Sequence, residues 1–256
     1  MKDIFSIKGK VALVTGGSRG IGSMIAAGFL SSGAKVYISS RKADACDETA
    51  KKLSEEYGGE CISIPADVSN VEGIEALADA IKAKEDKLDI LINNAGIALP
   101  TSIDNDDFEV YWDKTHNVLL KGQAILIREC LPFIEKSNTP RIVNISSTEG
   151  LGASPMHSPY TSAKHGVIGL TRSLAVELGK KGITVNCICP GPINTAMTEK
   201  IPDKDKEIYS KRRVPLRRYG DPEEVAHATL NFCLPSSSFI TGAVLAVDGG
   251  LTIKRA

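Results

Sequence analysis

The chain has 256 residues, which is enough for one large α/β domain or two small ones, and enough to bury a core without disulfide or metal support. Hydrophobic residues make up 42% and charged residues 24% of the sequence, an ordinary balance for a soluble globular protein. Lysine plus arginine number 31, and so do aspartate plus glutamate. This balance argues against binding nucleic acid or a membrane through overall charge.

Six cysteines are scattered through the chain, and none has the paired spacing of a zinc site. Cys187 and Cys189 form a C-x-C pair, which is either a redox or metal pair or two small residues on one face of a buried strand; we favour the second interpretation. The N-terminus has no apolar run, and no stretch approaches the roughly 20 apolar residues of a membrane helix. With reduced, buried thiols, these features predict a cytoplasmic protein without a metal or a membrane span.

Short apolar runs rich in Val and Ile alternate with helical patterns from end to end. The runs cover residues 11–14, 35–39, 61–64, 88–92, 141–145, 183–188 and 243–247, and helical segments such as 44–57 and 71–84 lie between them. Such runs are typical of strands buried on both faces, and their alternation with helices predicts a doubly wound parallel sheet. We therefore expect one α/β domain over residues 1–256, with seven strands.

One stretch, 194–219, interrupts this alternation. It is long, charged and contains prolines. We expect it to form an excursion over the carboxyl edge of the sheet.

The first apolar run leads directly into a glycine-rich turn, residues 15–22, and a helical pattern follows. Glycine allows a tight turn and a close approach of the backbone to a pyrophosphate, and the start of the helix supplies free N–H groups. A glycine cluster can also be a plain structural turn, but the order of strand, turn and helix is the one that dinucleotide binding requires.

Gly16, Gly20 and Gly22 stand as G-x-x-x-G-x-G, a spacing that resembles the short-chain dehydrogenase/reductase family. The resemblance covers nearly the whole chain. Asp67-Val68 resembles the family's adenine contact, Asn93-Asn94-Ala95-Gly96 its motif beside the cofactor ribose, and 190–195 its nicotinamide-side loop. Each motif follows one of the predicted strands.

The resemblance implies a Rossmann-type fold and a set of cofactor contacts. These contacts are Gly16, Ser18, Arg19, Gly20, Ile21, Gly22, Ser40, Arg41, Asp67, Val68, Asn93, Ala95, Gly96, Tyr160, Lys164, Pro190, Gly191, Ile193 and Thr195.

Tyr160 and Lys164 are four residues apart in a helical stretch, so their side chains are neighbours. A cation beside a phenol favours the phenolate, which would let the tyrosine exchange a proton near neutral pH. This pair alone is common by chance. Ser147 and Asn117 match the positions of the family's other catalytic residues, and the resemblance therefore implies a complete tetrad of Asn117, Ser147, Tyr160 and Lys164.

The cofactor preference is predicted from the end of the second run. Where family members that prefer NAD usually carry an aspartate, this chain has Ser40 followed by Arg41, and Arg19 lies in the glycine turn. Two guanidinium groups can bind the 2′-phosphate of NADP, and no carboxylate repels it. We expect NADP(H).

The substrate is the least constrained feature. The overall pattern most resembles 3-oxoacyl-[acyl-carrier-protein] reductases, which implies reduction of 3-oxoacyl thioesters carried on acyl carrier protein or CoA, and a homotetramer, with a dimer as the second possibility. Apolar residues that could line an acyl pocket are Ile97, Leu99, Leu151, Met156, Pro192 and Met197. A dehydrogenase of a sugar, polyol or hydroxysteroid, and a cofactor-binding scaffold without turnover, remain alternatives.

Overall fold

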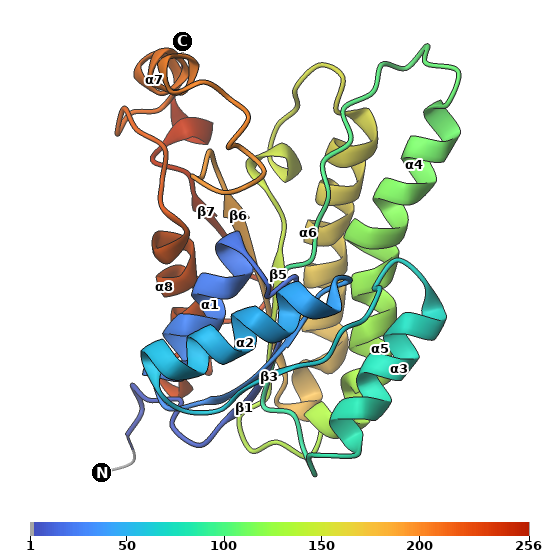
Figure 1. Cartoon of the computed structure of the whole chain (residues 1–256), viewed down its shortest axis with the longest axis vertical. Helices are drawn as coiled ribbons and strands as arrows, with labels where there is room; N and C mark the ends of the chain where they lie inside the picture. Colours follow the sequence, from blue (N-terminus) through green and yellow to red (C-terminus); the bar gives the residue numbers. More distant parts are fainter. Residues whose placement is uncertain (1–2, 256) are drawn as a thin grey trace.

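The computed structural model describes residues 3–255 and has a parallel sheet between two layers of helices (Figure 1). Seven strands are ordered β3-β2-β1-β4-β5-β6-β7. Their bounds are β1 Val11–Thr15, β2 Lys35–Ser39, β3 Cys61–Ser63, β4 Ile90–Asn93, β5 Arg141–Ile145, β6 Thr184–Pro190 and β7 Val244–Val247. The strand order reverses between β1 and β4, and sheets of this kind bind ligands at such a switch point.

The predicted doubly wound α/β fold is thereby confirmed. Helices α1 (Gly20–Ser31), α2 (Ala43–Tyr57) and α8 (Pro222–Cys233) cover one face of the sheet. The opposite face is covered by α3 (Val71–Lys82), α5 (Gly122–Ile134) and α6 (Ser158–Leu178), with α4 (Phe108–His116) beside α6 (Figure 1).

Alternation along β1 explains why the strand is apolar from Val11 to Val14. Ala12 and Val14 pack into the core under α1 and α8, whereas Val11 and Leu13 pack into the core under α3 and α5. Successive side chains of a strand point to opposite faces, so a strand covered on both faces needs an apolar residue at every position.

The helical region around Asn117 is interrupted. A π-helical turn, Asn117–Lys121, separates α4 from α5. Gly122 follows it, and a Cβ at Gly122 would lie 2.8 Å from the carbonyl oxygen of Asn117 and would also collide with that of Val68. The glycine therefore allows α5 to approach the loop after β3.

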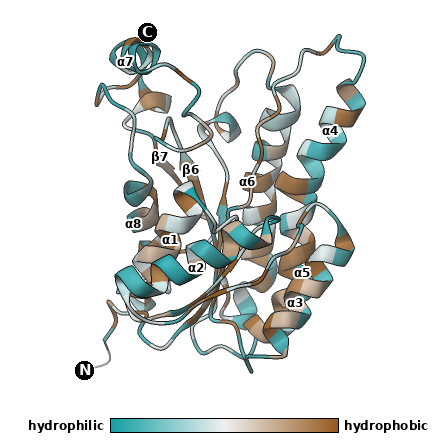
Figure 2. Cartoon of the chain, in the orientation of Figure 1, coloured by the Kyte–Doolittle hydropathy of each residue, from teal (hydrophilic) through white to brown (hydrophobic). Residues whose placement is uncertain are grey.

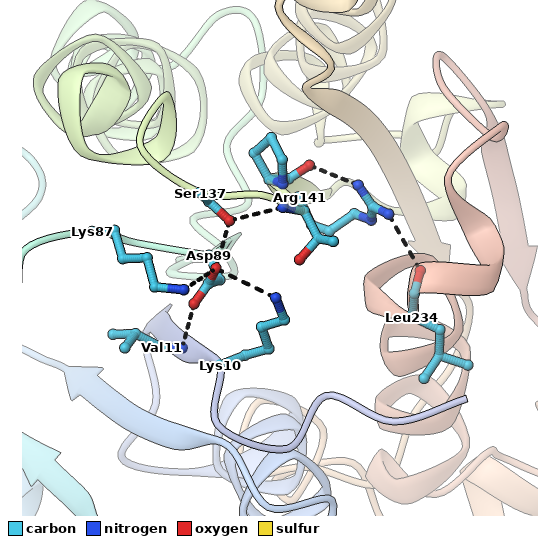
Figure 3. A network of polar contacts seen from close by, with 9 residues as sticks. Lys10, Val11, Lys87, Asp89, Ser137, Arg141 and Leu234 are labelled. Carbon is cyan, nitrogen blue, oxygen red and sulfur yellow. Dashed lines mark hydrogen bonds and ion pairs between the residues drawn. The ribbon is translucent and has the colours of Figure 1, made fainter. Parts of the chain in front are cut away.

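A polar network fixes the amino edge of the sheet (Figure 3). The fully buried Asp89 accepts hydrogen bonds from the Val11 amide (3.0 Å), Lys87 Nζ (3.0 Å) and Ser137 Oγ (2.5 Å). These contacts tie β1, the start of β4 and the loop before β5 together. Hydrogen bonds hold the pKa of Asp89 below its usual value despite burial.

Residues 194–219 contain a helix of their own, α7 (Asp203–Arg213), which lies beyond the carboxyl ends of β6 and β7 (Figure 1). This helix is largely hydrophilic (Figure 2). Among residues 3–255, no helix combines the length and the apolarity needed to cross a membrane.

Candidate active site

A cavity of about 670 Å³ opens at the carboxyl edge of the sheet and runs across the switch point. It is lined by all the residues predicted to contact the cofactor except Asn93. Of the four predicted catalytic residues, it is lined by Ser147, Tyr160 and Lys164. The fold thus gathers segments that are far apart in the sequence into one site.

The glycine turn is held against the loop after β4. Gly16 has a φ of +65°, and a Cβ there would lie 2.8 Å from Ala95 Cα. Asn94 Nδ2 donates to the carbonyls of Thr15 (2.9 Å) and Gly16 (3.2 Å), and Thr15 Oγ1 accepts from the amides of Asn94 (3.0 Å) and Ala95 (3.1 Å). Only glycine fits at position 16, because both the backbone angle and the space exclude a side chain.

The first turn of α1 faces this cavity. Its N-cap residue is Arg19, in extended conformation, and no side chain caps the helix. The N–H groups of a helix's first turn have no partners within the helix and carry the positive end of its dipole. This end of the cavity therefore suits a phosphate group.

The charged residues that line the cavity are mostly cationic. Arg19, Arg41, Lys42 and Lys164 line it, against a single carboxylate, Asp67. Asp67 Oδ1 accepts a hydrogen bond from the amide of Ser69 (2.9 Å). The cationic excess, concentrated beside Ser40, is suited to a polyanionic ligand.

The opposite end of the cavity contains the predicted acid and base groups. Tyr160 and Lys164 project from α6, and Lys164 Nζ lies 5.6 Å from the Tyr160 ring centroid. Lys164 Nζ donates to the carbonyl oxygen of Ile145 (2.8 Å), at the end of β5. Ser147 Oγ accepts from the amide of Glu149 (3.1 Å), which leaves the hydroxyl proton of Ser147 free to donate.

Burial shifts both titrating groups. It lowers the pKa of Lys164 from its usual 10.5 to about 8. It raises the pKa of Tyr160, and Ser147 beside the phenol partly counters the rise. The sequence led us to expect that the lysine would lower the tyrosine pKa. In the structure, the ammonium group points to the Ile145 carbonyl instead, so desolvation dominates at the phenol.

Two predicted site residues lie outside the cavity lining. Asn117 begins the π-helical turn. Asn93 is buried in the sheet, where its Nδ2 donates to Oδ1 of Asn144 (2.9 Å), and its neighbour Asn94 lines the cavity in its place.

Comparison with known proteins identifies the family. A family model described as enoyl-(acyl carrier protein) reductase matches residues 16–252. The rhamnolipids biosynthesis 3-oxoacyl-[acyl-carrier-protein] reductase of Pseudomonas aeruginosa is 37% identical over 98% of this chain and 99% of its own length. The chain belongs to the short-chain dehydrogenase/reductase family.

Further members of the short-chain dehydrogenase/reductase family are similar over their whole length. The 3-oxoacyl-[acyl-carrier-protein] reductase FabG of Thermotoga maritima is 36% identical over 96% of this chain and 99% of its own. The Pseudomonas aeruginosa RhlG/NADP active-site complex superposes with a TM-score of 0.93, at 37% identity, over 98% of this chain and 100% of that one. L-Sorbose reductase from Gluconobacter frateurii, complexed with NADPH and L-sorbose, has a TM-score of 0.92 at 28% identity, over 98% of this chain and 99% of that one.

Sequence reasoning missed part of the site of this short-chain dehydrogenase/reductase. Lys42, Asn94, Val118 and Ser146 line the cavity without having been predicted. Each lies one residue from a predicted position, so the motifs marked the right segments. Which side chain of a segment faces the cavity depends on backbone angles that the motif letters do not specify.

The predicted apolar pocket is only partly assembled. Ile97 and Met197 line the cavity, and Pro192 lines an adjoining hollow. Leu99, Leu151 and Met156 line neither space; Leu99 is half-buried, and Leu151 and Met156 are 42% and 57% exposed. The six cysteines are free thiols, and residues 3–255 contain no group of three or more His, Cys, Asp or Glu that could hold a metal ion.

Proposed function

We propose that this chain is an NADPH-dependent reductase that converts 3-oxoacyl thioesters to 3-hydroxyacyl thioesters. The observation that carries the proposal is one cavity with two different ends. The uncapped start of α1 and the cationic residues Arg19 and Arg41 lie at one end, and Ser147, Tyr160 and Lys164 lie at the other. Relatives support the same chemistry, because two that are similar over their full length are 3-oxoacyl-[acyl-carrier-protein] reductases. The reaction would belong to fatty acid metabolism.

The residues present fit NADPH. The uncapped start of α1 and the glycine turn would hold the pyrophosphate, and Arg19, Ser40 and Arg41 would hold the 2′-phosphate. The short-chain reductase RhlG, which is similar along its whole length, has been solved as an NADP complex. Asp67 and Val68 would bind on the adenine side, and Pro190, Gly191, Ile193 and Thr195 on the nicotinamide side.

When bound, NADPH supplies the hydride for the carbonyl carbon. Ser147 can donate a hydrogen bond from its hydroxyl group to the substrate oxygen and hold that oxygen in place. Tyr160, kept protonated by burial, donates the proton that the same oxygen takes up. The ammonium group of Lys164, whose Nζ lies 5.6 Å from the centroid of the Tyr160 ring, would stabilise the phenolate that remains. Asn117, in the π-helical turn that packs against α6, would help return a proton to the lysine.

We also propose that residues 1–256 act as one cofactor-binding domain, whose excursion 194–219 closes over the substrate. The cytoplasm is the proposed location. A homotetramer is the proposed assembly, supported by apolar side chains exposed on the outer helices and beside β7, among them Val110, Val176 and Phe239. The acyl group would arrive on acyl carrier protein or CoA.

A side-by-side assay tests the proposal. Purified protein with NADPH is given acetoacetyl-CoA, a simple ketone, a diketone, a ketosugar and a ketosteroid, and NADPH oxidation is followed. We expect turnover of the thioester at the highest kcat/KM. Turnover of the sugar or steroid with none of the thioester would assign the alternative class, and no turnover of any compound would favour a scaffold.

A further inference from the structure

A second hollow adjoins the catalytic end of the cavity. It has a volume of about 460 Å³ and lies between the excursion 194–219 and the carboxyl ends of β6 and β7. Gly191 and Thr198 line both spaces, and Thr148, directly after Ser147, lines the hollow. The hollow therefore begins beside the residue that would hold the substrate carbonyl, because Ser147 lines the cavity and Thr148 lines the hollow.

The walls of the hollow are largely apolar or aromatic. Its side chains include Thr148, Pro192, Ile201, Tyr209, Tyr219 and Leu251. One charged residue, Asp205, is among the lining residues, and it is exposed. The hydroxyl of Thr198 already donates to the carbonyl oxygen of Ile193 (2.8 Å). The remaining polar groups of the lining, the hydroxyls of Thr148, Tyr209 and Tyr219 and the Asp205 carboxylate, are few beside its apolar and ring surface, so the space suits an alkyl chain better than a sugar, which needs a partner for each of its hydroxyls.

The hollow is preformed, because its outer wall is fixed at several points. Tyr209 and Tyr219 meet edge to face, with centroids 6.1 Å apart at 73°, and Lys206 Nζ lies 5.8 Å from the Tyr219 centroid. The amide of Gly220 donates to the carbonyl oxygen of Pro192 (2.9 Å), and the amide of Leu216 donates to that of Gly249 (3.2 Å). These bonds tie the end of the excursion to the strand ends that form the floor.

We propose that this hollow holds the acyl chain of the substrate beyond its fourth carbon, so that Ile201, Tyr209 and Tyr219 set the chain length that is favoured. The inference rests on the proposed thioester reduction and adds the substrate class, which is a medium-length acyl chain. The volume is within the usual range of about 300–1,000 Å³ for ligand sites.

The test compares 3-oxoacyl-CoA substrates of four, six and eight carbons at saturating NADPH. Full burial of a methylene is worth about 0.8 kcal/mol, or about fourfold in kcat/KM. Since the hollow is open on one side, we expect at least about tenfold higher kcat/KM for eight carbons than for four. A flat series with acetoacetyl-CoA still reduced would overturn the inference and leave the proposed function standing.

Ile201→Trp fills the hollow and is expected to bring the eight-to-four carbon ratio down to about two or less, since the added methylenes stay in water. Ile208→Trp is the matched control: Ile208 lies on α7, is 54% exposed and does not line the hollow. Its ratio should equal that of the wild type. Tyr209→Ser, which removes part of the wall, should lower the ratio too and serves if the tryptophan variant fails to fold.

A binding measurement separates the two proposals if no thioester is reduced. Calorimetric titration of 3-hydroxyoctanoyl-CoA and 3-hydroxybutanoyl-CoA into the protein with NADP⁺ should show tighter binding of the longer chain by about tenfold or more. Ile201→Trp should abolish that difference. Equal affinity for the two chains, or an unchanged difference in the variant, would overturn the inference whatever the turnover.

Discussion

Tyr160 and Lys164 lie in one buried site, and desolvation shifts their pKa values in opposite directions. Burial keeps the phenol protonated, and it brings the lysine close to losing its proton, because both shifts favour the neutral form. A reductase needs a protonated tyrosine as its acid. It also needs a charged lysine, and Lys164 is charged only below its pKa of about 8. The site is therefore set for proton donation at neutral pH.

Tyr160→Phe removes the proton donor and keeps the ring that lines the cavity. We expect kcat to fall by about a thousandfold, within the range of general acid catalysis, and the Kd for NADPH to change by less than about twofold. Stopped-flow turnover and fluorescence titration measure the two quantities. Lys164→Ala, in contrast, should impair both. Substantial activity in the phenylalanine variant would show that another group is the acid.

The pH profile of reduction should depend on Lys164. Since burial lowers the pKa of Lys164 to about 8, kcat/KM should fall as pH rises through that value and the ammonium group loses its proton. Lys164→Arg keeps its charge over the same range. The variant, though slower, should show no such fall between pH 7 and about 10. An identical fall in both proteins would mean that a different group titrates.

The preference for NADPH should depend on the side chains at the end of β2. The wild type should prefer NADPH over NADH by at least about tenfold in kcat/KM, the effect of one charge-assisted contact at roughly 1.5–3 kcal/mol. The double substitution Ser40→Asp with Arg41→Ala should shift preference toward NADH, because the carboxylate accepts ribose hydroxyls and repels the phosphate. Equal wild-type efficiency with both cofactors would contradict this assignment.

At the scale of elements, the sequence predicted most strands closely. The run 35–39 coincides with β2, and 88–92 is displaced by one or two residues from β4 (Ile90–Asn93). The strand order and the π-helical turn at Asn117 were not predictable, because both depend on contacts between distant segments. The packing of Gly122 on Val68 is one such contact. The motifs could not distinguish Asn93 from Asn94 at the cavity, because the backbone angles at the end of β4 decide which of the two side chains faces it.

Gly122→Ala tests that contact between elements. The added Cβ would collide with the backbone carbonyl oxygens of Val68 and Asn117, so α5 must move away from the loop that carries Asp67. We expect a loss of about 1–3 kcal/mol in unfolding free energy, as for overpacking, and weaker NADPH binding. Gly28→Ala is the control: it lies inside α1 with nothing within 4 Å of its Cβ, and it should stabilise by up to about 1 kcal/mol. Chemical denaturation compares the two.

At the scale of the whole molecule, the two edges of the sheet have separate tasks. The amino edge carries the buried Asp89 network, which joins strands (Figure 3). None of the residues of this network lines the cavity. The carboxyl edge carries the glycine turn, the catalytic end and the excursion. The network at the amino edge stabilises the sheet, and the loops at the carboxyl edge are therefore free to differ in sequence and to bind a ligand.

The edge strand β7 is the feature from which assembly can be tested. Within residues 3–255, its outer backbone groups have no partner strand in the sheet. Phe239, in the segment that leads into β7, is fully exposed, and Leu245 on the strand is 39% exposed. An edge of this kind with apolar side chains beside it is suited to pairing with a second copy across a two-fold axis.

Light scattering at micromolar concentration should give four times the 27.3 kDa of one chain. Phe239→Ser should lower that mass, whereas Ile208→Ser, which changes an exposed residue on α7, should not. A wild-type monomer, or equal masses for the wild type and the Phe239 variant, would show that β7 is not where the copies meet.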